Sequence, residues 1–365
     1  MLALTLALSL GSGSEAACLQ SASLPLKCVE HGGLRRCWYT YAPQRLTRNA
    51  NNQSALVMVL HGYTACADDI AGYTGWTAQA DIHGFQLVIP QGTEALAGQA
   101  DRKPSWNAGG CCGAGAAAGI DDVGFLNKVL DDSVATLDAD PARLFISGHS
   151  NGCAMAQRLG VELSEKVTAV ACASFYLLAS SPSTYRTAVP FLEVHGQRDT
   201  TVPYGPSNRF GSWPGAEQNL REWAARNQCT KGPVTRALAG YTRISYGECD
   251  GARKSEVVLA SFPEGTHYVF PLFNIPSARV AWDFLQQYSR DGAVIVGTGA
   301  GADSPLYSAA EDFSGTTSSS SSPLGTVLGI AGGVVALIVA VAAVAYVRAG
   351  RRASADGRLP VIAVA

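Results

Sequence analysis

The feature that most constrains the fold is residues 143–159, where an apolar run leads into G-H-S-N-G and then into a helix-like segment. The apolar run is typical of a buried strand, and the G-x-S-x-G pattern that follows it is typical of a sharp strand-to-helix turn. Because Ser150 on such a turn has a strained backbone, the residues two positions away must lack bulk, as Gly148 and Gly152 do. Chance occurrence in a chain with 39 glycines is the alternative, and the strand–turn–helix context opposes it. The stretch predicts an exposed, nucleophilic Ser150.

Strand-like and helix-like segments alternate along the rest of the chain, which predicts a mostly parallel sheet with helices on both faces. A hairpin is expected first, over residues 28–41, with a turn at Gly32-Gly33. The small-residue stretch 105–118 is expected to be a loop. The further expected strands are 55–60, 85–90, 167–172, 191–195 and 256–262, and the expected helices are 76–82, 123–137, 219–225 and 279–288.

Composition favours a protein outside the cytosol. Only 15% of the residues are charged, and ten cysteines are typical of an oxidising compartment. The net charge of −2 gives no reason to expect a nucleic-acid partner. Residues 1–17 are expected to be a signal peptide, although no Lys or Arg precedes the apolar run. Asn52 begins an N-glycosylation sequon, which can be modified only if the chain enters a secretory lumen.

The C-terminal part predicts a membrane anchor. Residues 324–347 carry no charge and are long enough to cross a bilayer as one helix. Arginines follow at once, at positions 348, 351 and 352, so residues 348–365 are expected to be a cytoplasmic tail. Residues 291–323, rich in Ser, Gly and Thr, are expected to be a flexible stalk. The expected arrangement is a single-pass type I protein of the cell membrane, with a catalytic domain over residues 18–290 outside the cell.

A serine nucleophile needs a base, and the base needs an orienting acid. After an elbow of this kind the acid comes before the histidine in the chain. Of six histidines, only His267 follows a late strand at a glycine-containing turn, so it is the predicted base. Asp199, directly after the strand at 191–195, is the predicted acid; Asp250 and Glu264 are weaker candidates because neither follows a buried strand closely.

Acyl transfer also needs two N–H donors for the oxyanion. The residue after the nucleophile supplies one, which assigns the backbone of Asn151. The loop after an early strand, His61-Gly62-Tyr63, is expected to supply the other through Tyr63. His61 itself is expected to be a structural hydrogen-bonding residue.

These motifs together resemble the polyhydroxybutyrate depolymerase and feruloyl esterase family of α/β-hydrolases. The resemblance covers about residues 34–288 and rests on L-H-G-Y at 60–63, W-N-A-G-G-C-C-G at 106–113, D-D-V-G-F at 121–125, the elbow, the Asp199 loop and His267. It implies an α/β-hydrolase fold and a secreted-type serine carboxylic ester hydrolase without a cofactor or metal. In agreement, the metal-ligand spacings C-x-x-C and H-x-x-x-H are absent from the sequence.

The chain departs from that family beside the catalytic histidine. Members commonly have Trp-Pro there, whereas Tyr268 to Pro271 follow here. Tyr268 on one side and Trp106 on the other are expected to line the substrate cleft, and aromatic walls suit phenolic acids and sugars. Phe270 is as well explained by core packing. Because no polymer-binding domain follows, attack on solid polyester granules is not expected.

The cysteines allow several pairings. The resemblance implies Cys229 with Cys249, and a bond from Cys28 to Cys37 would close the first hairpin. Cys66 is expected to meet Cys111 or Cys112, because neighbouring cysteines rarely bridge each other. Two further cysteines, at positions 153 and 172, are expected to be buried thiols.

The sequence thus predicts an extracellular serine esterase acting on small or carbohydrate-linked esters, feruloyl or acetyl, or on hydroxyalkanoate oligomers. Two alternatives remain open at this point. One is a surface recognition protein that keeps the fold without turnover, and the other is a serine peptidase. The complete set of Ser150, Asp199 and His267 favours the enzyme.

Overall fold

A ten-stranded sheet forms the centre of the computed structural model, which describes residues 18–19, 23–94, 103–178, 184–208, 212–250 and 255–292. The strand order is β1-β2-β4-β3-β5-β6-β7-β10-β9-β8, and the strands from β4 to β10 in this order run parallel. Antiparallel strands complete both edges. The strands are β1 (Leu26–His31), β2 (Leu34–Tyr41), β3 (Ser54–Leu60), β4 (Gln86–Pro90), β5 (Ala139–Gly148), β6 (Ala169–Ala173), β7 (Phe191–Gly196), β8 (Lys231–Leu238), β9 (Tyr241–Gly247) and β10 (Val257–Phe262).

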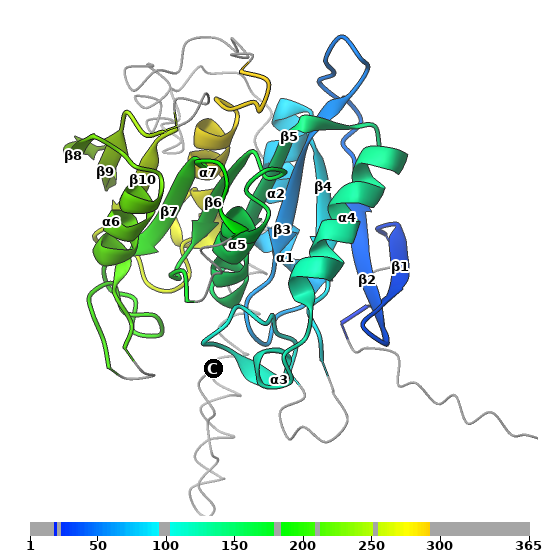
Figure 1. Ribbon diagram of the computed structural model, residues 1–365, viewed down its shortest axis with the longest axis horizontal. Helices are drawn as coiled ribbons and strands as arrows, with labels where there is room; N and C mark the ends of the chain where they lie inside the picture. Colours follow the sequence, from blue (N-terminus) through cyan, green and yellow to red (C-terminus); the bar gives the residue numbers. More distant parts are fainter. Residues whose placement is uncertain are drawn as a thin grey trace, which may run out of the picture. The chain divides into compact units, whose positions relative to one another are not determined.

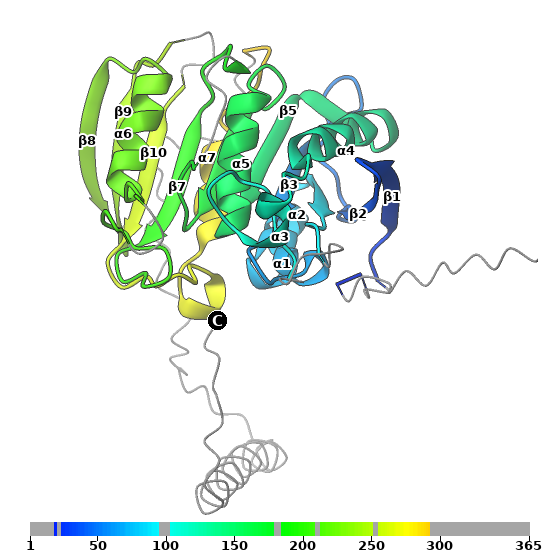
Figure 2. The same cartoon turned by 60° about the horizontal axis from the view of Figure 1, so that its bottom comes forward.

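Helices cover both faces of the sheet, as Figures 1 and 2 show. The helices are α1 (Ala67–Tyr73), α2 (Trp76–His83), α3 (Gly113–Ala117), α4 (Asp122–Thr136), α5 (Asn151–Glu162), α6 (Ala216–Arg226) and α7 (Ser277–Leu285). Along β3, Leu56 and Met58 point to the core shared with α4, α5 and α6, and Val57 and Val59 to the core shared with α1, α2 and α7. Because strand side chains alternate between faces, central strands that are apolar throughout build two separate cores. The predicted α/β-hydrolase architecture, a mostly parallel sheet between helices, is confirmed.

Several elements differ from the sequence-based expectation. Helix α1, short and carrying two acidic residues in its first turn, was not expected. The edge hairpin β8–β9 was not expected either, because β8 is exposed along almost its whole length and carries no apolar alternation. A short helix, α3, lies within the expected loop 105–118. Helices α1 and α3 and the β8–β9 hairpin are stabilised by contacts with the rest of the fold rather than indicated by a local sequence pattern.

Five disulfides join all ten cysteines. The expected bonds Cys28–Cys37 and Cys229–Cys249 are confirmed. The other expectations were wrong. Cys66 pairs with Cys18, at the start of the described chain, and the neighbours at 111 and 112 bond to each other, with their Cα atoms 3.2 Å apart. The cysteines at 153 and 172 are bonded rather than free, since α5 packs directly on β6.

Within the described residues, none of the helices has the length and apolar character needed to cross a membrane. The signal peptide expected at residues 1–17 lies outside the described residues, as do the expected span at 324–347, the tail, and all but the first two residues of the stalk.

Candidate active site

Ser150 lies on the turn between β5 and α5, at the end of the sheet where the parallel strands finish (Figure 1). Its backbone has φ 54° and ψ −126°, a conformation that costs free energy in a residue other than glycine. The amide of Ser150 donates to the carbonyl of Ala173 (2.9 Å), and that of His149 donates to Leu60 (3.1 Å). The two neighbouring strands therefore hold the strained turn in place.

The glycines of the motif are needed for close packing. A Cβ on Gly148 would overlap the backbone of Gly152, and a Cβ on Gly152 would overlap the carbonyls of Leu60 and His61. The first turn of α5 thus lies directly against the end of β3. This contact brings the loop after β3 next to Ser150.

His267 and Asp199 meet in the loops that follow β10 and β7. Nδ1 of His267 lies 2.7 Å from Oδ2 of Asp199, and the other carboxylate oxygen accepts the amides of Thr201 and Val202, each at 2.8 Å. Burial opposes the charge on Asp199, but the interactions with His195 and His267 outweigh it and hold the pKa of that carboxyl well below its usual range. Asp199 is therefore an ionised, fixed acceptor.

The loops that follow β7 and β10 are in close contact at Gly196 and Gly265. A Cβ on Gly196 would overlap the carbonyl of Gly265, and the amide of Arg198 donates to that same carbonyl at 2.8 Å. Glu264, a weaker candidate for the acid, instead forms an exposed ion pair with Arg198. The position of His267 relative to Asp199 is thus set by the sheet, because β7 and β10 are paired neighbours.

The predicted oxyanion loop packs on the elbow. A Cβ placed on Gly62 would lie 3.3 Å from Cβ of Ser150, so the backbone at residues 61–63 is adjacent to that serine. Asn151 is the first residue of α5, and a first-turn amide has no acceptor within its own helix. The predicted donors, Asn151 and Tyr63, thus belong to two segments that meet at Ser150.

The residues behind the oxyanion loop form a buried hydrogen-bonded layer. His61 accepts the amide of Gly92 at Nε2 (2.8 Å) and lies 2.8 Å from the carbonyl of Gly62 at Nδ1. Burial lowers the pKa of His61 to about 4, so it is neutral. Trp106 donates its indole N–H to the carbonyl of His61 (2.9 Å) and exchanges bonds with the Asn151 side chain.

Trp106 has no exposed surface in the described structure. The expectation that Trp106 lines the substrate cleft does not fit this position, because its indole N–H needs the buried carbonyl of His61. It supports the oxyanion loop from behind instead.

Tyr268, in contrast, is 45% exposed beside His267. Its ring lies 5.6 Å from that of His267 and stacks on Phe273, which is also exposed. Phe270 is buried and packs edge-on against Tyr73. The surface next to His267 is therefore aromatic, and the described chain places Tyr268 where a substrate could touch it.

Sequence reasoning missed His149, the residue before the nucleophile. Its Nε2 donates to the carbonyl of His267 (2.9 Å), to which Ser174 also donates (3.1 Å). Burial and the neighbouring His267 lower the pKa of His149 to about 3, so it stays neutral. Only the fold reveals this role, because the residues are more than a hundred positions apart.

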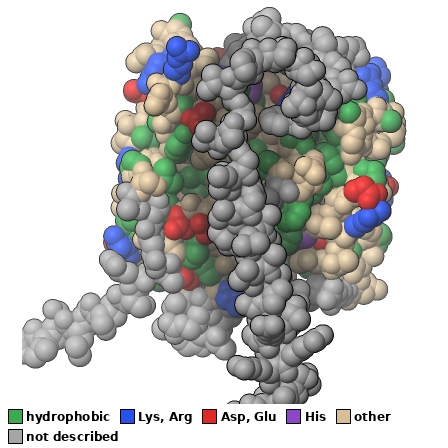
Figure 3. Space-filling model, turned by 180° about the vertical axis from the view of Figure 1, so that it is seen from behind, with side chains coloured by type: hydrophobic (Ala, Val, Ile, Leu, Met, Phe, Trp, Pro, Cys, Tyr) green, Lys and Arg blue, Asp and Glu red, His purple; other side chains and the backbone are tan. Residues whose placement is uncertain are grey.

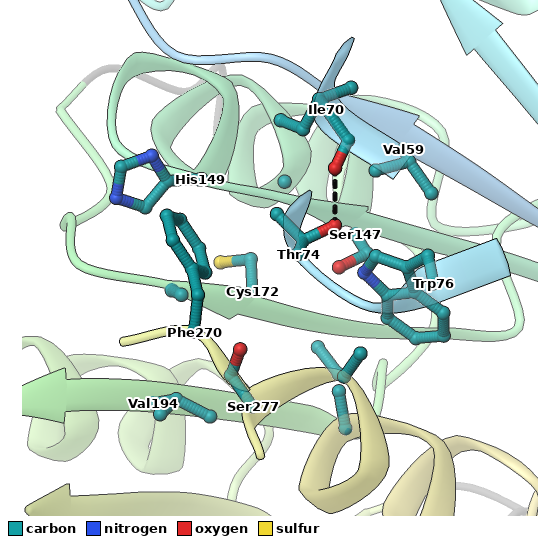
Figure 4. Close-up of a pocket in the computed structure, with 15 residues that line it drawn as sticks. Val59, Ile70, Thr74, Trp76, Ser147, His149, Cys172, Val194, Phe270 and Ser277 are labelled. Carbon is teal, nitrogen blue, oxygen red and sulfur yellow. Dashed lines mark hydrogen bonds between the residues drawn. The ribbon is translucent and has the colours of Figure 1, made fainter. Parts of the chain in front are cut away.

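A small cavity lies under the elbow, with His149 and Phe270 near one end and Trp76 near the other (Figure 4). Its volume of about 20 Å³ has room for a single water molecule and not for a substrate. No cluster of metal-ligating side chains occurs in the described part of the chain.

Comparison with known proteins agrees with this geometry. Feruloyl esterase B of Piromyces equi is 29% identical over 224 residues, which are 58% of this chain and 38% of that protein. The bifunctional acetylxylan esterase/xylanase XynS20E of Neocallimastix patriciarum is 24% identical over 281 residues, 75% of this chain and 36% of that protein. The chain thus spans well under half the length of either.

Among solved structures, a ferulic acid esterase from Anaeromyces mucronatus, in complex with ferulic acid, has a TM-score of 0.48 at 14% identity over 74% of this chain and 91% of that one. The family of phospholipases and carboxylesterases matches residues 44–213, which include the oxyanion loop, the elbow and Asp199. Over these residues the chain is similar to the phospholipase/carboxylesterase family of α/β-hydrolases.

Proposed function

We propose that this protein is a serine carboxylesterase with Ser150 as nucleophile, His267 as base and Asp199 as orienting acid. The observation that carries the proposal is the 2.7 Å contact of His267 Nδ1 with the buried, ionised Asp199, in loops beside the strained Ser150 turn. With Nδ1 bound to Asp199, Nε2 of His267 is the nitrogen that takes the proton of Ser150.

The reaction has two steps. Ser150 Oγ attacks the ester carbonyl, and the oxyanion is bound by the N–H groups of Asn151 and Tyr63. His267 then returns its proton to the leaving alcohol, which departs as the acyl-enzyme forms. Water attacks this acyl-enzyme with His267 again as base, and the acid is released.

The substrates proposed are small or carbohydrate-linked esters, feruloyl or acetyl, or hydroxyalkanoate oligomers. Two observations support this range: the exposed aromatic surface around Tyr268, and the feruloyl and acetylxylan esterases among the relatives. On the face seen in Figure 3, the described acidic and basic side chains are scattered rather than gathered by sign.

The deciding test of the function is a substrate panel on the purified chain. Nitrophenyl, feruloyl and acetylated-xylan esters, hydroxybutyrate oligomers and a set of peptides would be compared. Ester hydrolysis is expected, with the nitrophenyl esters fastest. Cleavage of peptides but not esters would favour a peptidase, and no turnover of any substrate would favour a recognition protein.

Tyr268→Ala is expected to raise KM for feruloyl and sugar esters by about twofold to tenfold, since a stacked ring contributes about 0.5–1.5 kcal/mol. Hydrolysis of nitrophenyl acetate by the same variant is expected to change much less, because its acyl group is small. Ile82→Ala is the matched control, as Ile82 is an exposed apolar residue on α2. Equal losses on all esters would mean that Tyr268 supports the fold rather than the substrate.

We also propose that the catalytic domain acts outside the cell on a C-terminal anchor. Five disulfides support an oxidising compartment, and the uncharged run at 324–347 followed by arginines supports the anchor. Protease added to intact cells is expected to release the domain by cutting within residues 291–323. If the domain is protected and a C-terminal tag is cleaved instead, the orientation is the opposite of the one proposed.

A further inference from the structure

A buried polar cluster that the proposed mechanism does not use lies directly behind Asp199. At its centre is His195 on β7, fully buried like its neighbour Glu193. Nδ1 of His195 lies 2.6 Å from Oε1 of Glu193, and Nε2 lies 2.9 Å from the carbonyl of Val202. The same Nε2 is 3.4 Å from Oδ2 of Asp199, the oxygen that His267 contacts.

These contacts fix the protons. A backbone carbonyl can only accept, so Nε2 of His195 carries a hydrogen that points to Val202. At Nδ1, two lone pairs facing each other at 2.6 Å would repel in a site without water. A proton therefore lies between His195 and Glu193.

Two amide side chains decide which partner holds that proton. The amide N–H of Leu177 faces Oδ1 of Asn219 (3.1 Å), and the indole N–H of Trp223 faces Oε1 of Gln157 (2.8 Å). Because both of these groups only donate, the orientation of both amides is set. Nδ2 of Asn219 then donates to Oε2 of Glu193 at 2.7 Å. This donor keeps a proton off Oε2, and a hydrogen bond donated to the charged form favours Glu193 as a carboxylate and His195 as an imidazolium.

Burial raises the pKa of Glu193 and so opposes its charge, while the hydrogen bonds from His195 and Asn219 act in the opposite direction. Burial alone would lower the pKa of His195, but its contacts with Asp199 and Glu193 outweigh burial and raise the pKa to about 10. The aromatic rings that face His195 come from Tyr176 and Tyr204, whose pKa values burial raises, so both stay neutral. On the sheet, Ser261 of β10 is its neighbour, and His149 on the elbow is neutral. The charges in the cluster are thus those of Glu193, His195 and Asp199.

We propose that His195 is a positioning residue of the catalytic site: a buried imidazolium, fixed by Glu193, that holds Asp199 ionised and directed at His267. This inference rests on the proposed triad. A positive charge beside Asp199 disfavours a second proton on the Asp199–His267 pair. His195 therefore extends catalysis to lower pH, in addition to holding the loop through Val202.

The test is the pH profile of kcat/KM of the full chain on a small nitrophenyl ester. Glu193→Gln keeps the shape of the side chain but removes the charge that fixes the imidazolium. The acid limb of the profile is expected to move to higher pH by about one unit. The double variant Glu193→Gln/His195→Gln, which removes both charges and keeps a donor for Val202, is expected to show the same shift.

Tyr176→Phe is the matched control. It removes the hydroxyl that donates to the carbonyl of Pro203 in the same loop, but no charge. It is expected to lower stability or kcat while the acid limb stays in place. If the cluster has a purely structural role, the acid limb stays in place in all three variants. That result would overturn the proposal.

A measurement on the parent protein covers the case in which the variants do not fold. In ¹⁵N-histidine NMR spectra at pH 8, one histidine is expected to keep both ring nitrogens protonated, whereas only neutral histidines at that pH would overturn the proposal. Ser150→Ala separates this question from the function itself. If esterase activity does not depend on Ser150, the proposed mechanism fails; if it does and the profiles of the variants match the parent, only the role of His195 fails.

Discussion

Ser150→Ala is expected to lower kcat for ester hydrolysis by about 10⁴-fold or more, because no other group then forms the acyl-enzyme. The fold is expected to persist, since the change removes one oxygen and leaves the glycines around the elbow in place. Loss of activity would be measured with a nitrophenyl ester, and folding by circular dichroism and the thermal midpoint.

The matched control is Ser289→Ala. Ser289 lies near the opposite end of β5, where its hydroxyl bonds to the carbonyl of Ala142 and to Asp291. This variant is expected to keep full activity. A serine-directed phosphonate should add its mass to the parent and to Ser289→Ala, but not to Ser150→Ala. Residual activity of Ser150→Ala within about tenfold of the parent, a loss under about 1.4 kcal/mol, would place the nucleophile elsewhere.

Gly196→Ala is expected to have the second-largest effect. Its added methyl group would overlap the carbonyl of Gly265, so the acid loop and the histidine loop would have to move apart. Overpacking of this kind costs about 1–3 kcal/mol of stability. A displacement near 1 Å at the catalytic groups costs about 100-fold in rate. Both the unfolding midpoint and kcat/KM are therefore expected to fall.

Gly205→Ala is the control for Gly196→Ala. A Cβ at Gly205 would meet nothing within 4 Å, so this variant is expected to leave stability and activity nearly unchanged. If Gly196→Ala lowered stability but kept the parent's kcat/KM, the spacing of Asp199 and His267 would not depend on this contact.

The parts of the molecule that sequence could predict are those with short-range signals. The elbow needs small residues at fixed positions around Ser150, so its pattern is visible in the chain. The central strands were predictable because they are buried on both faces and read as continuous apolar runs. Asp199 and His267 could be located because each follows such a strand.

What sequence could not predict depends on contacts between distant segments. The exposed β8 has no apolar alternation, and only its pairing with β9 makes it a strand. Trp106 looked like a cleft residue because its loop is rich in glycine, yet its indole N–H is bound to the carbonyl of His61. His195 had no visible role, because Glu193, Asn219 and Asp199 surround it only in the folded chain.

The spacing of the disulfides bears on how such a chain is made. In four of the five bonds the partners are at most 20 residues apart in sequence, and in the fifth they are 48 apart. During vectorial entry into an oxidising compartment, each cysteine of the four short pairs meets its partner soon after emerging, before cysteines further along the chain are present. Mispairing among these eight cysteines therefore has little opportunity during synthesis, whereas Cys18 is still unpaired when Cys28 and Cys37 emerge. A fully reduced and unfolded chain has no such order, so refolding from that state would need disulfide exchange to reach the same pairs.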